Sequence, residues 1–175
     1  MNKPIAGNRI FNTLKDTKCI VLACNTRITI GVAKGIFRAA KELDSALIME
    51  LARTECNHKV GYTGLTPATL SENLRKANEE VGHDIWALHA DHIGIKKGDP
   101  EEIKDVKELI SAQIKAGYTS FAIDASHLFN FDGKSVEEEL EPNIIATIEV
   151  GKFIQEKMKG KEFGLEVEVG EIGRK

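Results

Sequence analysis

No stretch of this 175-residue chain approaches the roughly 20 consecutive apolar residues that a membrane-spanning helix needs, so we expect no membrane insertion. An excess of basic charge is also missing, and the formal net charge of −3 argues against a nucleic-acid-binding surface. Cysteine is scarce and odd in number, since Cys19, Cys24 and Cys56 form no Cys-x-x-Cys pair. With no signal-peptide pattern at the start, these absences favour a cytoplasmic protein with free thiols.

Short apolar runs alternate with helical patterns along the whole chain. The predicted strands cover residues 19–24, 46–49, 85–89, 120–123 and 163–169. A short helix over residues 8–16 precedes them, and apolar residues at helical spacing follow each of the first four strands. Cys19 and Cys24 fall in the first apolar run, where we expect them to be small core residues.

Strands that alternate with helices indicate an α/β fold with a parallel sheet and crossover helices. Nothing in the composition divides residues 1–175 into more than one domain. A doubly wound sheet and part of a (β/α)₈ barrel both fit this pattern. A complete barrel needs about 250 residues, so the chain would supply only the first five of the eight units.

Polar side chains gather where the predicted strands end. These residues are Asn25, Glu50, Asp91 with His92, Asp124 with Ser126, and Glu168. In a parallel sheet all these ends lie on one rim, where barrels and open α/β folds place their chemistry. Each carboxylate taken alone could cap a following helix. Several on one rim favour a converging acidic site that a divalent cation would stabilise.

The spacing within two strands decides which side chains share a face. His89 and Asp91 are two residues apart, as are Glu166 and Glu168, so each pair lies on one face of an extended segment. His92 would point to the opposite face unless the strand ends before it. Because two inward carboxylates are costly without partners, Glu166 and Glu168 indicate either a metal-facing strand or an edge strand with solvated acids.

Three motifs resemble those of the class II, zinc-dependent fructose-bisphosphate and tagatose-bisphosphate aldolases. His89-Ala90-Asp91-His92 is similar to the family's His-x-Asp-His strand end, and residues 123–127 are similar to its Ile-Asp-x-Ser-His segment. Residues 165–170 are similar to its Glu-x-Glu-hydrophobic-Gly strand. The order and separation of the motifs also match, so the resemblance covers nearly the whole chain as the N-terminal part of the family's barrel.

The resemblance implies a role for each residue on the rim. Asp91 would be the catalytic group that protonates and deprotonates the substrate hydroxyl during carbon–carbon cleavage. His92 would be one of three histidines on a catalytic Zn²⁺ or another divalent cation, with Asp124 and Glu168 near a second or alternative metal position. The zinc would act as a Lewis acid on the ketone of dihydroxyacetone phosphate and stabilise its enediolate. Substrate would be bound by Asn25 and Glu50.

The implied activity is reversible cleavage of a ketose 1,6-bisphosphate, fructose or tagatose, to dihydroxyacetone phosphate and glyceraldehyde 3-phosphate. The implied partners are this phosphorylated sugar and either further copies of the chain, as a homo-oligomer, or an aldolase partner subunit. Neither nucleic acid nor a membrane is implied as a partner.

A second resemblance favours an alternative, the accessory, non-catalytic subunit of tagatose-bisphosphate aldolase. Glu50, Asn57 and residues 61–68, which begin Gly-Tyr-Thr-Gly, are similar to that subunit. The catalytic enzymes usually end the second strand in a substrate-binding Ser, where this chain has Ala52.

The family's later elements bear on the activity we expect. Its acidic loop with a catalytic Glu, its two later Gly-His strand ends and its phosphate-binding loops have no counterpart in these 175 residues. One of the three zinc histidines is therefore present, and we expect no aldolase activity from this chain alone. A third possibility is an α/β small-molecule-binding module whose rim acids only cap helices.

Overall fold

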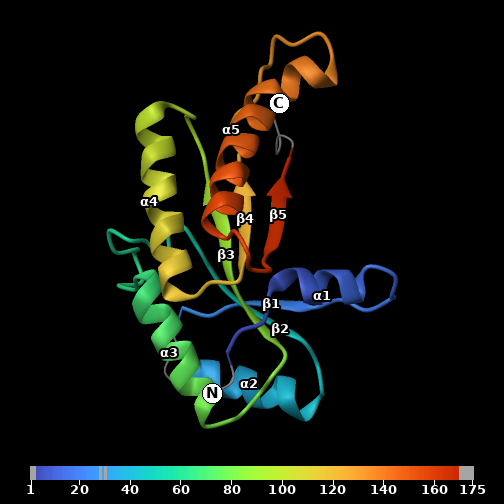
Figure 1. Ribbon diagram of the computed structural model, residues 1–175, viewed down its shortest axis with the longest axis vertical. Helices are drawn as coiled ribbons and strands as arrows, with labels where there is room; N and C mark the ends of the chain where they lie inside the picture. Colours follow the sequence, from blue (N-terminus) through green and yellow to red (C-terminus); the bar gives the residue numbers. More distant parts are fainter. Residues whose placement is uncertain (1–2, 28, 30, 170–175) are drawn as a thin grey trace.

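The computed structural model describes residues 3–27, 29 and 31–169, and these form a five-stranded parallel sheet with its strands in sequence order (Figure 1). The strands are β1 (Leu22–Asn25), β2 (Leu47–Ala52), β3 (Trp86–Gly94), β4 (Ser120–Asp124) and β5 (Gly164–Glu168). The helices are α1 (Gly7–Leu14), α2 (Val32–Glu42), α3 (Pro67–Glu79), α4 (Pro100–Ala116) and α5 (Val136–Lys157). A helix separates each pair of consecutive strands, which confirms the predicted α/β fold.

The helices α2 to α5 cover one face of the sheet. Their apolar side chains form a single buried cluster with alternate strand residues, among them Met49, Leu88 and Phe121. Phe37 of α2 packs edge-to-face against Trp86 of β3, with ring centroids 5.1 Å apart. Helices on one face and strands in sequence order are the arrangement of barrel units, whereas a doubly wound sheet carries helices on both faces.

The short helix α1 covers the opposite face at the amino-terminal ends of the strands, near the base of β5 in Figure 1. Ile10 of α1 is buried with Ile48 and Ala87, which point away from the other helices. The helix begins at Gly7, where an added Cβ would lie 2.5 Å from Ser120 Oγ, so only glycine permits this approach. Because α1 covers the amino-terminal ends, the carboxyl-terminal rim is left for a site.

Local signals in the sequence explain where the helices begin and end. The Asp99 side chain accepts a hydrogen bond from the Glu102 backbone N–H (2.8 Å) at the start of α4, and Gly117 ends that helix with φ of 86°. Thr66 caps α3, and Pro67 takes its first position. Among the described residues, no helix has both the length and the apolar character needed to cross a membrane.

The observed bounds of β1 and β3 differ from the predicted ones in ways that move predicted residues. β1 begins at Leu22 and Cys19 is exposed, so the expectation that Cys19 is a core residue is wrong. The reason is that, within the described part of the chain, β1 pairs with β2 alone, and that pairing starts at Leu22. β3 runs to Gly94 rather than ending at residue 89, so the Asp-His pair lies within the strand. Gly170, the last residue of the third motif, lies outside the described residues.

A buried carboxylate joins the carboxyl-terminal ends of β1 and β2. Glu55, in the loop after β2, is only 3% exposed. It accepts hydrogen bonds from the Asn25 amide (2.6 Å), the Arg27 guanidinium (2.6 Å), the Tyr62 hydroxyl (2.8 Å) and the Ala52 backbone N–H (2.9 Å). Burial alone would raise the pKa of Glu55, but these donors outweigh it and lower that pKa to about 2.

Glu55→Gln is expected to lower the free energy of unfolding by about 2–3 kcal/mol at neutral pH, because an amide cannot accept from all four donors. The pKa of Glu55 in the folded state lies below its ordinary value of 4.5. This stabilisation is therefore present above that value and is lost as the pH falls towards 2. Chemical denaturation of both proteins between about pH 3 and pH 7 measures the difference.

Glu72→Gln is the matched control, because Glu72 forms an exposed ion pair with Lys76 on α3. This substitution should leave the free energy of unfolding nearly unchanged. Equal effects of the two substitutions, or a Glu55 effect that does not shrink on acidification, would contradict the role assigned to Glu55.

Candidate functional site

A β-bulge in β3 brings Asp91 and His92 to the same side of the sheet. The pairing register between β3 and β4 shifts between Ala90 and Ile93, so Asp91 and His92 stand opposite the single residue Ala122. His92 adopts a left-handed backbone conformation with φ of 39°. In a regular strand these two neighbouring side chains would point to opposite faces of the sheet. They share a face because of the bulge, and not because the strand ends before His92.

His92 lies among three carboxylates from neighbouring strands. Its Nδ1 lies 2.9 Å from Glu168 Oε1 of β5 and 3.3 Å from Asp124 Oδ2 of β4. Its Nε2 lies 3.8 Å from Asp91 Oδ1. The imidazole is 52% exposed, so the cluster opens to solvent. The structure thus brings together the four residues for which the sequence predicts catalytic and metal-binding roles.

Ser126, two residues after the end of β4, orients the side chain of Asp124. Its Oδ1 accepts hydrogen bonds from the backbone N–H (3.0 Å) and the hydroxyl (2.6 Å) of Ser126, which leaves Oδ2 to face His92. Burial alone would raise the pKa of Asp124, but these bonds and the contact with His92 lower it. Asp124 therefore keeps its negative charge beside the imidazole.

The other charges in the cluster raise two pKa values. Burial opposes the charged form of His92, but the hydrogen bond to Asp124 and the charges of Asp91 and Glu168 outweigh it and raise the pKa of His92. Burial, and then the charge of Asp124, raise the pKa of Glu168. Protonated His92 supplies one positive charge to these acids, and a divalent cation would supply two.

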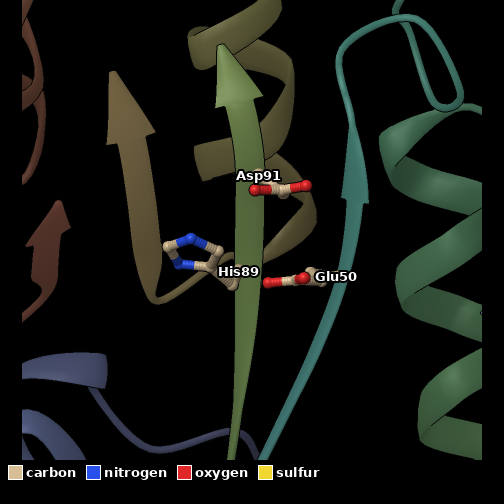
Figure 2. A group of neighbouring side chains, drawn as sticks. All are labelled: Glu50, His89 and Asp91. Atoms are coloured by element: carbon tan, nitrogen blue, oxygen red, sulfur yellow. The ribbon is translucent and has the colours of Figure 1, made fainter. Parts of the chain in front are cut away.

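A second polar group lies on β2 and β3, next to the residues around His92. Figure 2 shows Glu50 beside His89 and Asp91, and one ligand atom from each lies within 4.8 Å of the others. His89 is buried with its Nδ1 2.7 Å from Ser120 Oγ, and burial lowers the pKa of His89 to about 4. Burial, and then the charge of Asp91, raise the pKa of Glu50 to about 7. At neutral pH, His89 is neutral and Glu50 exchanges its proton.

Asn25 lies on the same rim, paired with Glu50 in the β1–β2 register. Its amide nitrogen donates to Glu55, so its carbonyl oxygen is the group left to face a ligand. The structure therefore places the two residues predicted to bind substrate on adjacent strands at one level of the sheet.

A cavity of about 570 Å³ opens beside His92 and Asp124. Its lining also includes Ala52, Lys96 and His127. The volume is that of a site for a small ligand. A ligand in this cavity would contact His92 and Asp124 directly.

Sequence reasoning missed three residues that orient the polar groups of the sheet, namely Glu55, Ser120 and Arg53. Ser120 and Arg53 act on partners far along the chain, so no local pattern marks them. Glu55 does have a local signal, because its carboxylate folds back onto the backbone N–H of the residue three positions earlier. That spacing is also used at the starts of helices.

Another group of metal-competent side chains, His58, Asp105 and Glu108, lies beside α4. Asp105 there already pairs with Arg53 (2.9 Å) and with Lys59. Two cations thus compete for a carboxylate that a metal ion would need, which makes this group a weaker metal site than the group around His92.

Known proteins are similar to this chain in sequence or in fold. Over 101 residues the chain is 27% identical to the D-tagatose 6-phosphate 4-epimerase of Agrobacterium fabrum, a match to 54% of this chain and 24% of that protein. The chain thus spans about a quarter of this relative's length. A probable tagatose 6 phosphate kinase from Sinorhizobium meliloti superposes with a TM-score of 0.62 at 18% identity, over 84% of this chain and 38% of the other. At that identity the likeness is one of fold.

The family model for class-II fructose-bisphosphate aldolase matches residues 6–175. The matched segment includes every strand of the sheet and the whole cluster around His92. On this evidence, the chain belongs to the class-II fructose-bisphosphate aldolase family.

Proposed function

We propose that this chain carries the metal-binding and acid–base part of an active site for reversible aldol cleavage of a ketose 1,6-bisphosphate, fructose or tagatose. The observation that carries the proposal is the bulge in β3, which turns His92 towards Asp124 and Glu168 while Asp91 stays beside it. Family membership supports the class of reaction, and the arrangement of these four side chains supports their division of roles.

The donors around His92 suit a divalent cation. One imidazole and carboxylates from neighbouring strands form a set that Zn²⁺ accepts, as do other divalent metals. We assign the ion to His92 and Glu168, whose ligand atoms lie within 4.8 Å of each other and of Asp91, and to Asp124, which lies 3.3 Å from His92 Nδ1 and lines the cavity. When bound, the ion supplies Lewis acidity towards a carbonyl oxygen of the substrate.

Asp91 is the residue proposed to move the proton. Burial raises the pKa of its carboxyl above the ordinary value, which brings its proton affinity closer to that needed near neutral pH. Asp91 would take a proton from the substrate hydroxyl during cleavage and return it during condensation. Asn25, through its carbonyl oxygen, and Glu50 would bind substrate hydroxyl groups.

An accessory, non-catalytic subunit is the second candidate, and Ala52 favours it. Ala52 lines the cavity beside His92, where its methyl group cannot donate a hydrogen bond to a substrate. In this role the chain would stabilise a catalytic aldolase subunit, and the acids of the rim would not take part in proton transfer.

The purified chain is expected to bind Zn²⁺ or Co²⁺ at His92. Because His92 must lose its proton to bind the metal and its pKa is raised, the affinity should increase as the pH rises through and above 6.5. Asp124→Asn and Glu168→Gln should each weaken binding by about 10- to 100-fold. Calorimetric titration with each metal on both sides of that pH measures these effects.

Glu149→Gln is the control for this titration, because Glu149 pairs with Lys107 in the groove between α4 and α5. Its affinity for either metal should equal that of the wild type. Unchanged binding by Glu168→Gln, or affinity that falls with rising pH, would show that the metal binds elsewhere.

Cleavage of fructose and tagatose 1,6-bisphosphate, followed through the triose phosphate released, separates the two candidate functions. We expect no cleavage by the chain alone, and a gain of activity when it is combined with a class II aldolase subunit. If this chain is catalytic, Asp91→Asn should reduce that gain by about 10²- to 10⁴-fold, because it removes the general acid–base group.

Other outcomes of this assay point to other functions. An accessory subunit would raise the partner's activity equally well with Asp91→Asn. Interconversion of hexose phosphates without release of triose phosphate would indicate an epimerase, the activity for which the Agrobacterium relative is named.

A further inference from the structure

Arg53, the first residue after β2, binds the bulged part of β3 at two points. Its backbone N–H donates to the carbonyl oxygen of His92 (3.4 Å), and its guanidinium Nη1 donates to the carbonyl oxygen of Gly94. These two carbonyls flank Ile93, where the pairing with β4 resumes. Arg53 therefore extends the hydrogen bonding between β2 and β3 by one residue beyond Ala52, and its side chain adds a bond to β3 after the bulge.

The guanidinium is fixed in turn by α4. Its Nη2 donates to Asp105 Oδ2 (2.9 Å), and Nη1 lies 3.6 Å from Glu102 Oε1. The Arg53 side chain is only 18% exposed, so these contacts are largely shielded from water. Glu102 also accepts hydrogen bonds from the backbone N–H groups of Lys97 (2.7 Å) and Gly98 (3.0 Å), in the loop that leaves β3. Arg53 thus connects β2, β3 and α4.

The backbone of His92 needs such support. Its φ of 39° lies in the left-handed region, which residues other than glycine seldom adopt. A strained conformation of this kind persists where the surrounding structure determines it. If the bulge relaxed into regular pairing, alternation would turn the imidazole of His92 away from Asp91 and towards the helix-covered face.

We propose that Arg53 is a positioning residue of the candidate metal centre. The backbone N–H to His92 would be present with any residue at position 53, so it is the guanidinium bond to the carbonyl oxygen of Gly94 through which Arg53 maintains the bulge that directs the imidazole towards Asp124 and Glu168. The role of His92 as a metal ligand rests on the proposed function, whereas the control of its backbone conformation does not. A guanidinium suits this task because its donors point in several directions, so that it binds β3 and α4 at once.

Two variants, Arg53→Ala and Arg53→Lys, test this role against the control Lys59→Ala. Lys59 also binds Asp105, but among the described residues it makes no hydrogen bond to β3, so its loss spares the bulge. NMR of the metal-free protein reports the backbone of His92 through its ¹³Cα shift and the imidazole through its ¹⁵N shifts. Titration with Co²⁺ then reports the affinity and the absorption spectrum of the bound metal.

We expect the wild type and Lys59→Ala to show a His92 ¹³Cα shift typical of positive φ, and both Arg53 variants to lose it. The affinity for Co²⁺ should fall about 10- to 100-fold in Arg53→Ala. Added ethylguanidinium should restore that affinity, which would not occur if the substitution had only lowered the general stability.

Unchanged His92 shifts in both Arg53 variants would overturn the inference, whatever the metal titration shows. A wild type that binds no Co²⁺, but whose His92 shifts still depend on Arg53, would refute the proposed metal role and support the positioning role. If Arg53→Ala fails to fold, Arg53→Lys decides the matter, because it retains a positive charge beside Asp105.

Discussion

The whole site depends on one irregularity of pairing, at which two residues of β3 stand opposite Ala122 of β4. In a regular strand, neighbouring side chains alternate, and either Asp91 or His92 would enter the apolar layer beneath the helices. The bulge lets two adjacent residues face the same small volume, and the proposed function uses both, Asp91 as the acid–base group and His92 as a metal ligand. Its cost is a left-handed conformation at His92, which hydrogen bonds from Arg53 stabilise.

Electrostatics imposes the second constraint, because acids from four strands share one rim. Crowding and burial raise the pKa of Glu50 to about 7 and also raise the pKa of Glu168. The pKa of Asp124 is lowered instead, by its hydrogen bonds from Ser126, and the pKa of Glu55 is lowered by its four donors. Perturbed groups of this kind are common where a protein binds a cation or transfers protons. The rim thus combines acids that stay charged with one acid, Glu50, whose proton exchanges near neutral pH.

The sequence was sufficient to predict features whose signals are local. Residues close together in the sequence determine the helical spacing, the N-cap at Asp99 and the end of α4 at Gly117. The polar strand ends meet because parallel strands bring their carboxyl-terminal ends to one edge of the sheet. The full length of β3 and its bulge were beyond prediction, because pairing with β4 decides both. The importance of Glu55 could not be predicted because its burial, and its bonds to Asn25 and Arg27, arise only in the folded chain. The prediction that Cys19 is a core residue was wrong for a related reason, because an apolar run is buried only where other elements cover it.

The central claim is that a divalent cation binds where the bulge directs His92. Anomalous diffraction at the zinc absorption edge, from crystals grown with stoichiometric Zn²⁺, tests this most directly. The account predicts one strong peak within coordination distance of His92, Asp124 and Glu168, with Asp91 beside it. A peak at His58, Asp105 and Glu108 instead, or none on the rim, would contradict the account.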